Sequence, residues 1–593
     1  MQEFLTRMQV LFQQLGERVS GAISAAEPDK AVVAALDAVL PVACAALRVA
    51  GIVFAVLILY RCVASLVREK TGRELWGWLT TEGGARFDLL HWENTLGRGR
   101  WADVALEVPT VSRSHAALLR DDRGNWRLQP LQTKNGTRLN GQDVAHTVPV
   151  HTGDIIDLGG LLLAFHAVSE RTEREEAMRW GVAERPLSPA RTLGYLTVFQ
   201  IMMAVQCLPG RTGPEMGLIA VAFGILITAM WGLYGIYRSR RRTAFELESI
   251  AFLLCTVSFG ITSAHSPTGL LRQGICLLMG LVVFFGLSVL LRDLRTTVAL
   301  RWPVAILTCL LLIFNVVLGQ RLFGAKNWID LGFVSFQPSE IAKFGVICSF
   351  AAIMAAHTRD MKTIRYGVAP YVVILGIIAV LLYLEPHMSA TLIILALGFI
   401  LMTLGGTDWK YLVGLVILGC LLVAVYLLTK GYTGGRISAW LHPENDPLDK
   451  GLQVLQSQYA IGSGGLLGLG FGRGRQKYLY LPEEHNDYIF AIACEELGFV
   501  GAIGILILFA LLIIRGYWIA MHARDRFSML LAAGLTTLLA LQVFLNVAVV
   551  TNLLPSTGIS LPFFSYGGTA LIMQLAENGI VLNVSRSITQ SPR

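Results

Sequence analysis

The sequence predicts a polytopic α-helical membrane protein into which a soluble all-β module is inserted. Of its 593 residues, 54% are hydrophobic and the mean hydropathy is +0.57, which is too apolar for a soluble protein of ordinary composition. Apolar runs of membrane-crossing length recur along the chain, whereas residues 80–172 contain short alternating strands separated by turn residues. The net charge of +8 is modest, and no run of Lys and Arg resembles a nucleic-acid-binding patch. We therefore expect a membrane, and no nucleic acid, as partner.

The N-terminal part begins with an amphipathic segment, residues 1–38, which lacks the small-residue cleavage site of a signal peptide. Residues 39–62 form the first expected transmembrane helix, with Arg48 inside it. An arginine within a span is either functional, or it snorkels and packs against a neighbouring helix, and the sequence leaves both readings open. A basic flank after this span places its C-terminal end in the cytoplasm, through Arg61, Arg68, Lys70 and Arg73.

Several short motifs punctuate the β-rich region in a characteristic order. They are Gly97-Arg98, Ser112-Arg113-Ser114-His115, Thr133-Lys134-Asn135-Gly136-Thr137 and Asn140-Gly141. In this order and spacing they resemble the forkhead-associated (FHA) domain, a β-sandwich that binds phosphothreonine peptides on the loops at one end.

The resemblance implies that Arg98 and Ser112 hold the phosphate, that Asn135 holds the peptide backbone, and that His115 braces the loops. A guanidinium fork and a hydroxyl donor suit a phosphate group. Lys134 stands where the family usually has a small hydroxyl residue, so the resemblance leaves open which peptides the domain prefers. The alternative is a degenerate FHA domain that serves only protein contact.

The rest of the chain is dominated by apolar spans. Two additional transmembrane helices are expected within residues 192–240, before the cluster Arg240-Arg241-Arg242. From residue 245 onward we expect ten further spans, at 245–264, 273–291, 300–318, 338–357, 367–384, 388–404, 410–428, 488–514, 527–550 and 566–585.

The distribution of basic residues orients these spans. When the spans are counted in order, the connections that carry the clusters around Arg295, Arg365 and Arg526 all lie on the same side of the membrane. Basic residues favour the cytoplasmic side, so this side is the cytoplasmic one. The β module and the C-terminus are then also cytoplasmic. Three polar loops lie on the extracytoplasmic face, at residues 321–337, 430–487 and 552–564.

The loop 430–487 is far longer and more charged than a simple connection requires. It carries six basic and six acidic residues, and seven glycines fall between Gly462 and Gly474. Glycines allow backbone N–H groups to approach an anion, and clustered Arg and Lys supply countercharge for phosphates. We interpret the loop as an active or binding surface; the alternative is a flexible, solvated linker.

The three extracytoplasmic loops also carry a specific set of motifs. They include Gln337-Pro338-Ser339-Glu340, Pro443-Glu444-Asn445-Asp446-Pro447, Leu481-Pro482-Glu483-Glu484-His485-Asn486-Asp487 and Pro562-Phe563-Phe564-Ser565-Tyr566-Gly567-Gly568. With these motifs, residues 245–586 resemble the shape, elongation, division and sporulation (SEDS) family of RodA, FtsW and SpoVE proteins. The resemblance implies a ten-helix core in a bacterial plasma membrane. It also implies an inverting glycosyltransferase that polymerises lipid II into peptidoglycan during cell elongation, division or sporulation, with a class B penicillin-binding protein as partner.

This reaction needs a base for a sugar hydroxyl and cations for the leaving diphosphate. Asp446 matches the essential loop aspartate of the family and is the expected base. Arg436, Arg473 and Lys477 are candidate diphosphate partners. No cofactor is implied; a divalent cation such as Mg²⁺ or Mn²⁺ is compatible with the chemistry, although no His and Cys cluster indicates a tight metal site.

Further polar residues are candidates for substrate binding. Glu340 and Lys343, three residues apart on one helix face, are expected to pair, either to pack the spans or to contact substrate. Of Glu495 and Glu496, one is expected to line the central cavity, whereas the other only begins a helix. His485 is either an acid/base group or a hydrogen-bonding brace. Glu385-Pro386-His387 departs from the family pattern Gln-Pro-Asp.

Two other functions use the same features. The spans could form a lipid II flippase, because polar residues in membrane helices serve transport as well as catalysis. A transporter would place its ionisable residues at the midplane, whereas here they concentrate on the outer face. The chain could also be a scaffold that recruits phosphorylated partners, although the retained Asp446 favours an enzyme.

Overall fold

The chain divides into two compact units in the computed structural model. The helical unit comprises Met1–Ser65, Leu187–Met521 and Phe527–Arg586, and the other consists chiefly of Leu66–Pro186. The structure describes residues 30–68, 75–91, 93–99, 102–120, 124–131, 135–168, 188–209, 211–239, 245–265, 267–290, 301–318, 320–322, 325–330, 335–358, 360–385, 387–429, 438–449, 451–478, 481–482, 486–523, 525–566 and 568–589.

The smaller unit is a β-sandwich, as the alternating pattern predicts. A six-stranded sheet has the order β2-β1-β11-β10-β7-β8, and a five-stranded sheet has the order β4-β3-β5-β6-β9. All pairs within these sheets are antiparallel except β3 and β4. The strands are β1 Gly77–Thr81, β2 Arg86–Leu89, β3 Glu93–Gly97, β4 Val104–Ala105, β5 Ala116–Arg120, β6 Trp126–Pro130, β7 Thr137–Leu139, β8 Gln142–Asp143, β9 Val148–Val150, β10 Ile155–Leu158 and β11 Leu161–Ala167.

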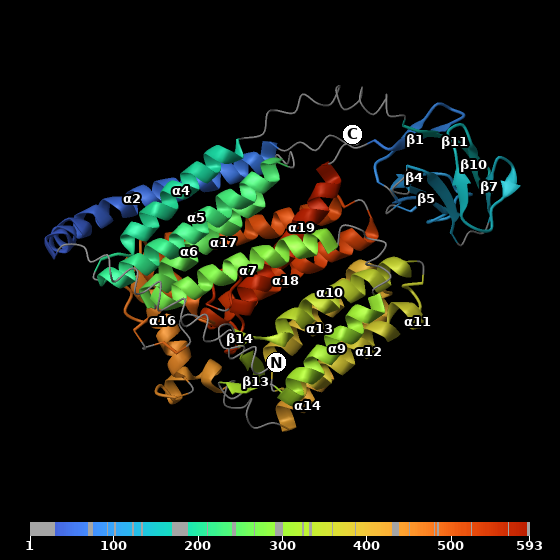
Figure 1. Ribbon diagram of the computed structural model, residues 1–593. Helices are drawn as coiled ribbons and strands as arrows, with labels where there is room; N and C mark the ends of the chain where they lie inside the picture. Colours follow the sequence, from blue (N-terminus) through green and yellow to red (C-terminus); the bar gives the residue numbers. More distant parts are fainter. Residues whose placement is uncertain are drawn as a thin grey trace, which may run out of the picture. The chain divides into compact units, whose positions relative to one another are not determined.

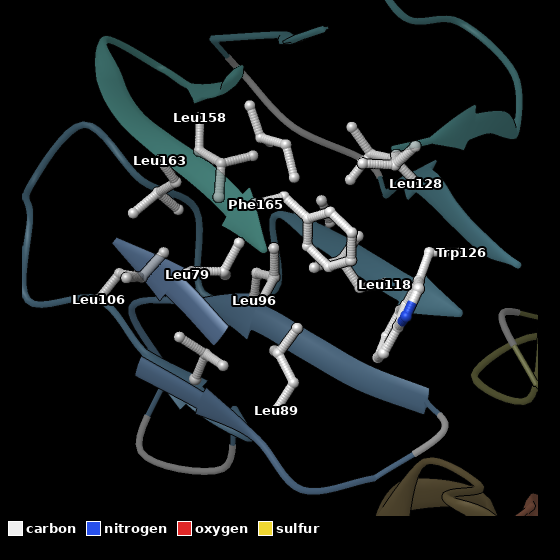
Figure 2. Packing of buried hydrophobic residues seen from close by; sticks show 14 of the residues in the cluster. Leu79, Leu89, Leu96, Leu106, Leu118, Trp126, Leu128, Leu158, Leu163 and Phe165 are labelled. Atoms are coloured by element: carbon white, nitrogen blue, oxygen red, sulfur yellow. The ribbon is translucent and has the colours of Figure 1, made fainter. Parts of the chain in front are cut away.

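The two sheets enclose one apolar core, which Figure 2 shows from close by. Leu79 and Phe165 are cross-strand partners in the first sheet, and Leu96 and Leu118 face them from the second. All four side chains are fully buried. Each contributes about 1.5–3 kcal/mol to folding relative to an exposed position. This core gives the loops at the ends of the sandwich a rigid base.

Three helices precede the long membrane core, namely α2 (Lys30–Arg68), α4 (Pro189–Gln206) and α5 (Gly213–Ser239). The predicted segment 1–38 is described only from Lys30, where it is part of α2. Helix α2 packs antiparallel to α4: Arg61 Nε donates to Thr192 Oγ1 (3.0 Å), and the Phe54 and Tyr195 rings meet edge to face. Figure 1 shows α2, α4 and α5 side by side.

Ten long helices follow in the described part of the chain, one for each predicted span. Over the whole described part of the chain, eight helices are long and apolar enough to cross a membrane, and these include α2 and α5. Three more helices are apolar but shorter. The ten are α6 Glu246–His265, α7 Pro267–Leu290, α9 Arg301–Leu318, α10 Pro338–Ala356, α12 Ala369–Leu384, α13 Met388–Gly405, α14 Trp409–Thr429, α17 Ile489–Met521, α18 Arg526–Val550 and α19 Gly568–Thr589.

The loops between these helices hold structure that the sequence did not predict. Strands β12 (Gln320–Leu322), β13 (Ala325–Asp330) and β14 (Ser335–Phe336) form a small sheet in the first polar loop. The long loop contains a 3₁₀ turn, η1 (Pro443–Asn445), and a helix, α16 (Leu452–Gly464). A helical segment also breaks at Gly498 (φ 68°), which kinks α17 just after its two glutamates.

Candidate functional site

The described part of the long loop is anchored to the segment that follows α18. Trp440 Nε1 donates to Asn552 O (3.1 Å), and Ser457 Oγ donates to Val550 O (2.8 Å). Gln453 Nε2 donates to Pro482 O (3.2 Å), which ties α16 to the far end of the loop. These bonds hold η1 and α16 in place, which disfavours the flexible-linker alternative.

The three polar loops come together, as the motifs predict. Asn546 Nδ2 donates to both Asp487 O and Ile559 O (2.7 Å each), so α18 links the end of the long loop to the loop after it. Ser565 Oγ donates to Asn486 O (2.7 Å). The first loop joins through Gln337 N, which donates to Thr569 Oγ1 (3.3 Å). Hydrogen bonds therefore link the described parts of all three motif-bearing segments.

Asp446 lies at the end of η1, on a tight turn. The turn is closed by Gly451 N, which donates to Asp446 O (2.9 Å). A Cβ at position 451 would collide with the carbonyl oxygen of Pro443, so only glycine lets the chain pass this close. The Asp446 side chain is half-buried and makes no hydrogen bond or ion pair with the residues that the structure describes. Its carboxylate can therefore accept a proton or hydrogen bond from a substrate.

The glycine-rich segment folds over the start of α17 and surrounds two glutamates. Glu495 Oε1 accepts a hydrogen bond from Arg475 N (2.7 Å), and Glu496 Oε1 accepts one from Gly472 N (3.1 Å). Lys477 Nζ lies 2.6 Å from Glu496 Oε1, and both side chains are buried. The glycines do let backbone N–H groups approach an anion, but here the anion is a carboxylate of the chain itself.

The other predicted site residues are distributed as follows. Glu340 and Lys343 form the expected ion pair, 2.8 Å long and buried in the first turns of α10, which confirms the pairing. Arg473 is exposed beside the glycine-rich segment. Arg436, His485 and Lys134 lie outside the described residues.

The loops of the β-sandwich are organised around His115, which is fully buried. Its Nδ1 accepts a hydrogen bond from Ser112 N (3.1 Å), so Nε2 carries the proton and donates to Gly136 O (2.8 Å). The predicted bracing role is confirmed. Arg98 N donates to Ser112 O (2.9 Å), and Asn135 Nδ2 donates to Thr110 O (2.7 Å).

The three predicted phosphopeptide contacts therefore sit on adjoining loops. Arg98 and Asn135 are exposed and Ser112 is half-buried, so all three remain accessible to a peptide. His115 links the Ser112 loop to the loop that follows Asn135. This arrangement presents a guanidinium, a hydroxyl and an amide at one end of the sandwich, a set suited to a phosphorylated segment.

A resident metal site does not fit the residues described. Among them, no group of three or more His, Cys, Asp or Glu side chains is placed to hold a metal ion. The acidic residues that do cluster, Glu495 and Glu496, are occupied by backbone N–H groups and by Lys477.

Comparison with known proteins assigns the larger part of the chain. The family model of the cell cycle proteins FtsW, RodA and SpoVE matches residues 243–590. The chain belongs to the FtsW/RodA/SpoVE family. In this family member the match begins just before α6, so α2, α4, α5 and the β-sandwich are additions to the family core. The FHA domain model matches residues 94–159, within that sandwich.

Relatives of this FtsW/RodA/SpoVE family member come from several branches. It is 36% identical over 363 residues to the probable peptidoglycan glycosyltransferase FtsW of Geobacter sp. (strain M18), covering 58% of this chain and 98% of the relative. It is 37% identical over 311 residues to the peptidoglycan glycosyltransferase MrdB of Escherichia coli (strain K12), covering 52% and 82%. It is 38% identical over 263 residues to the stage V sporulation protein E of Bacillus subtilis (strain 168), covering 44% and 72%.

One similar solved structure comes from a larger assembly. A chain of a peptidoglycan synthase complex, described as coordinating polymerization and crosslinking, matches with a TM-score of 0.50 at 32% identity. The match covers 59% of this chain and 99% of that one. The helical core of this family member therefore has the fold of a peptidoglycan synthase subunit.

Proposed function

We propose that this chain is a peptidoglycan glycosyltransferase that polymerises lipid II in a bacterial plasma membrane, with inversion at the transferred sugar. Its relatives in the family are named as enzymes of this class. The long loop lies on the extracytoplasmic face in this proposal, and the FHA domain lies in the cytoplasm, following the basic residues between the spans. A class B penicillin-binding protein is the proposed partner, since the similar solved chain belongs to a complex that also crosslinks.

The placement of Asp446 carries the proposal. Its carboxylate stands on a turn that is closed by Gly451 and is anchored through Trp440. It would accept the proton of a sugar 4-hydroxyl as that oxygen attacks C1 of the second sugar. The bond from C1 to the diphosphate breaks, and its electron pair leaves on the diphosphate. Exposed Arg473, together with Arg436, would stabilise the charge that develops there.

The remaining candidates have supporting roles in this proposal. Lys477 and Glu495 shape the glycine-rich segment, and the Glu340–Lys343 pair holds α10 at the edge of the site. His485 would complete the substrate contacts. No resident cofactor is required in this scheme. We expect polymerisation without any added cofactor. If a chelator abolished polymerisation and Mg²⁺ or Mn²⁺ restored it, a divalent cation would be part of the substrate complex.

The decisive experiment is a gel assay of lipid II polymerisation. The full-length protein is purified alone and with its cognate class B penicillin-binding protein, and wild type is compared with Asp446→Ala. We expect a loss of at least about 100-fold, the usual size of a general-base contribution. Glu444→Ala is the matched control, because Glu444 lies on the same turn, is exposed and contacts only His442 among the described residues. Its activity should match wild type.

The same preparations distinguish the transporter alternative. If neither preparation makes polymer, while vesicles that contain wild type move lipid II across the bilayer, the chain is a flippase and Asp446 is not a base. Polymer from wild type and from Asp446→Ala alike would leave the enzyme class intact and remove Asp446 from the mechanism.

We also propose that the FHA domain places the polymerase under the control of threonine phosphorylation. Arg98 and Ser112 would bind the phosphate and Asn135 the peptide backbone. The support is the match of the FHA model to residues 94–159 and the exposure of Arg98 and Asn135 on loops braced by His115.

A further inference from the structure

Two cavities of different character meet at Arg48 in the helical unit. The first has a volume of about 370 Å³ and is lined by Arg48, Gln206, Arg211, Ser263, Arg473 and Tyr478. This volume falls in the range of roughly 300–1,000 Å³ that is typical of small-molecule sites. Three guanidinium groups reach it from segments far apart in sequence, namely α2, the connection between α4 and α5, and the long loop.

The second cavity is an apolar groove of about 200 Å³. Side chains of α2, α4, α6 and α17 line it, among them Val56, Phe199, Leu253, Val500 and Leu508. Arg48, Gln206 and Phe471 line both cavities, so the groove continues from the cationic cavity. Glu496 also lines the groove, where its charge is matched by Lys477.

Arg48 is held at the junction by the glycine-rich segment. Gly470 has φ +96°, and a Cβ there would overlap the Arg48 guanidinium, so the backbone passes directly against it. Arg211 is fixed by its own bond, since Nη2 donates to Ser263 O (3.0 Å). Both guanidinium groups are therefore preorganised around the cavity, which reduces the cost of ordering them when a ligand binds.

We propose that the two cavities form one binding site for a polyprenyl phosphate. The phosphate would lie among the guanidinium groups of Arg48, Arg211 and Arg473, and the isoprenoid chain would lie along the apolar groove. Arg473 is also the proposed partner of the leaving diphosphate, so it is shared between the two sites. Guanidinium forks suit phosphate oxygens, and basic pockets between membrane helices bind lipid head groups. A polyprenyl phosphate has one isoprenoid chain, which suits a single groove better than the two acyl chains of a phospholipid do.

The site is built partly from residues outside the family core. Arg48, Gln206 and Arg211 all precede residue 243, where the family match begins. Only the choice of a polyprenyl lipid rests on the proposed function, because that reaction uses and releases polyprenyl diphosphates, which carry the same isoprenoid chain. The binding site itself does not depend on the identity of the base.

Lipid binding to the purified full-length protein tests the proposal. Native mass spectrometry in detergent would follow titration with undecaprenyl phosphate, and in parallel with phosphatidylglycerol and with inorganic phosphate. We expect undecaprenyl phosphate to bind most tightly, and Arg48→Gln and Arg211→Gln each to weaken it roughly tenfold, the usual effect of one charge-assisted contact. Arg272→Gln is the control, since Arg272 is exposed on α7 and lines neither cavity.

A second pair of variants tests the groove without removing a charge. A Cβ at Gly504, which lines the groove, meets no atom within 4 Å, so the side chain of Gly504→Leu can start from this position and occupy part of the groove. A Cβ at Gly235 on α5 is equally unobstructed, and Gly235 lines neither cavity. We expect Gly504→Leu to weaken undecaprenyl phosphate binding and Gly235→Leu to leave it unchanged.

Three outcomes would overturn the proposal. They are wild-type affinity in folded Arg48→Gln and Arg211→Gln, equal affinity for phosphatidylglycerol, and inorganic phosphate binding as tightly as the lipid. Arg48→Lys keeps the charge and serves as the second variant if Arg48→Gln does not fold. Asp446→Ala should bind undecaprenyl phosphate like wild type. If the wild-type protein bound this lipid but made no polymer, the proposed polymerase activity would be wrong and the lipid site would stand.

Discussion

Lys477 Nζ lies 2.6 Å from Glu496 Oε1, and both side chains are buried where the glycine-rich segment crosses the start of α17. Removing one member of a buried ion pair leaves an uncompensated charge and costs about 3–5 kcal/mol. We expect Lys477→Met to lower the unfolding temperature and to reduce polymerisation. The double variant Lys477→Met/Glu496→Leu should regain most of the stability.

The double variant separates two roles of Lys477. If Lys477 only holds the loop, polymerisation returns together with stability, as measured by thermal unfolding and by the lipid II assay. If stability returns and polymerisation does not, Lys477 also contacts the diphosphate. A Lys477→Met protein with wild-type stability would contradict the structural importance of the pair.

Gly451 controls the turn that carries Asp446. A side chain there would collide with Pro443 O, so Gly451→Ala should displace the turn and reduce polymerisation while the helices remain folded. Gly462→Ala is the control: it lies in neighbouring α16, its Cβ meets no atom within 4 Å, and alanine favours a helix over glycine by about 1 kcal/mol. Equal activity of the two variants would argue against a role for this turn.

The FHA loops allow binding and folding to be separated. Arg98→Ala should abolish the binding of phosphothreonine peptides to the full-length protein without affecting its stability, because the side chain is exposed. His115→Ala should lose binding by loosening the loops, since two hydrogen bonds of a buried ring disappear. Arg127→Ala is the control, because Arg127 is an exposed arginine in β6. Binding that does not require the phosphate would favour the degenerate-domain alternative.

Glu385, in the loop between α12 and α13, makes stability depend on pH. Burial raises the pKa of Glu385 from 4.5 to about 7, so the folded protein holds this proton more tightly than the unfolded chain does. The resulting stabilisation is present below about pH 4.5 and is lost as the pH rises through about 7. Relative to wild type, Glu385→Gln should therefore be more stable at about pH 8 than at about pH 5.

Thermal unfolding of both proteins across this pH range checks the sign. Burial also lowers the pKa of nearby His387 to about 4, which opposes the trend at low pH but is common to wild type and variant. A constant difference between Glu385→Gln and wild type would show that Glu385 does not titrate in this range.

The sequence was a good guide to the fold and a partial guide to the site. Apolar length and turn residues report directly on helices and strands, so every predicted span coincides with a described helix and the β module is a sandwich. The Glu340–Lys343 pair could be predicted because spacing on one helix decides it. Lys477 and Glu496 are joined only because an irregular glycine-rich segment folds back over α17.

The contact of Arg48 with Gly470 was beyond prediction for the same reason. The two residues lie on elements more than four hundred positions apart, and no periodicity links an N-terminal helix to a loop in the core. The small sheet of β12, β13 and β14 was also missed, because β12 and β14 have only three and two residues.

Helices α2 and α4 meet where the inserted module leaves and rejoins the helical unit. Arg61 Nη2 donates to Ser188 O (3.1 Å). The end of α2, where the chain leaves the helical unit, therefore lies close to the start of α4, where the chain returns to it. If the FHA module were deleted, a short linker could therefore join the end of α2 to the start of α4. A polymerase lacking the FHA module should assemble in the membrane normally. If the proposed phosphothreonine control is correct, it should also no longer respond to a kinase, so one deletion would separate regulation from synthesis.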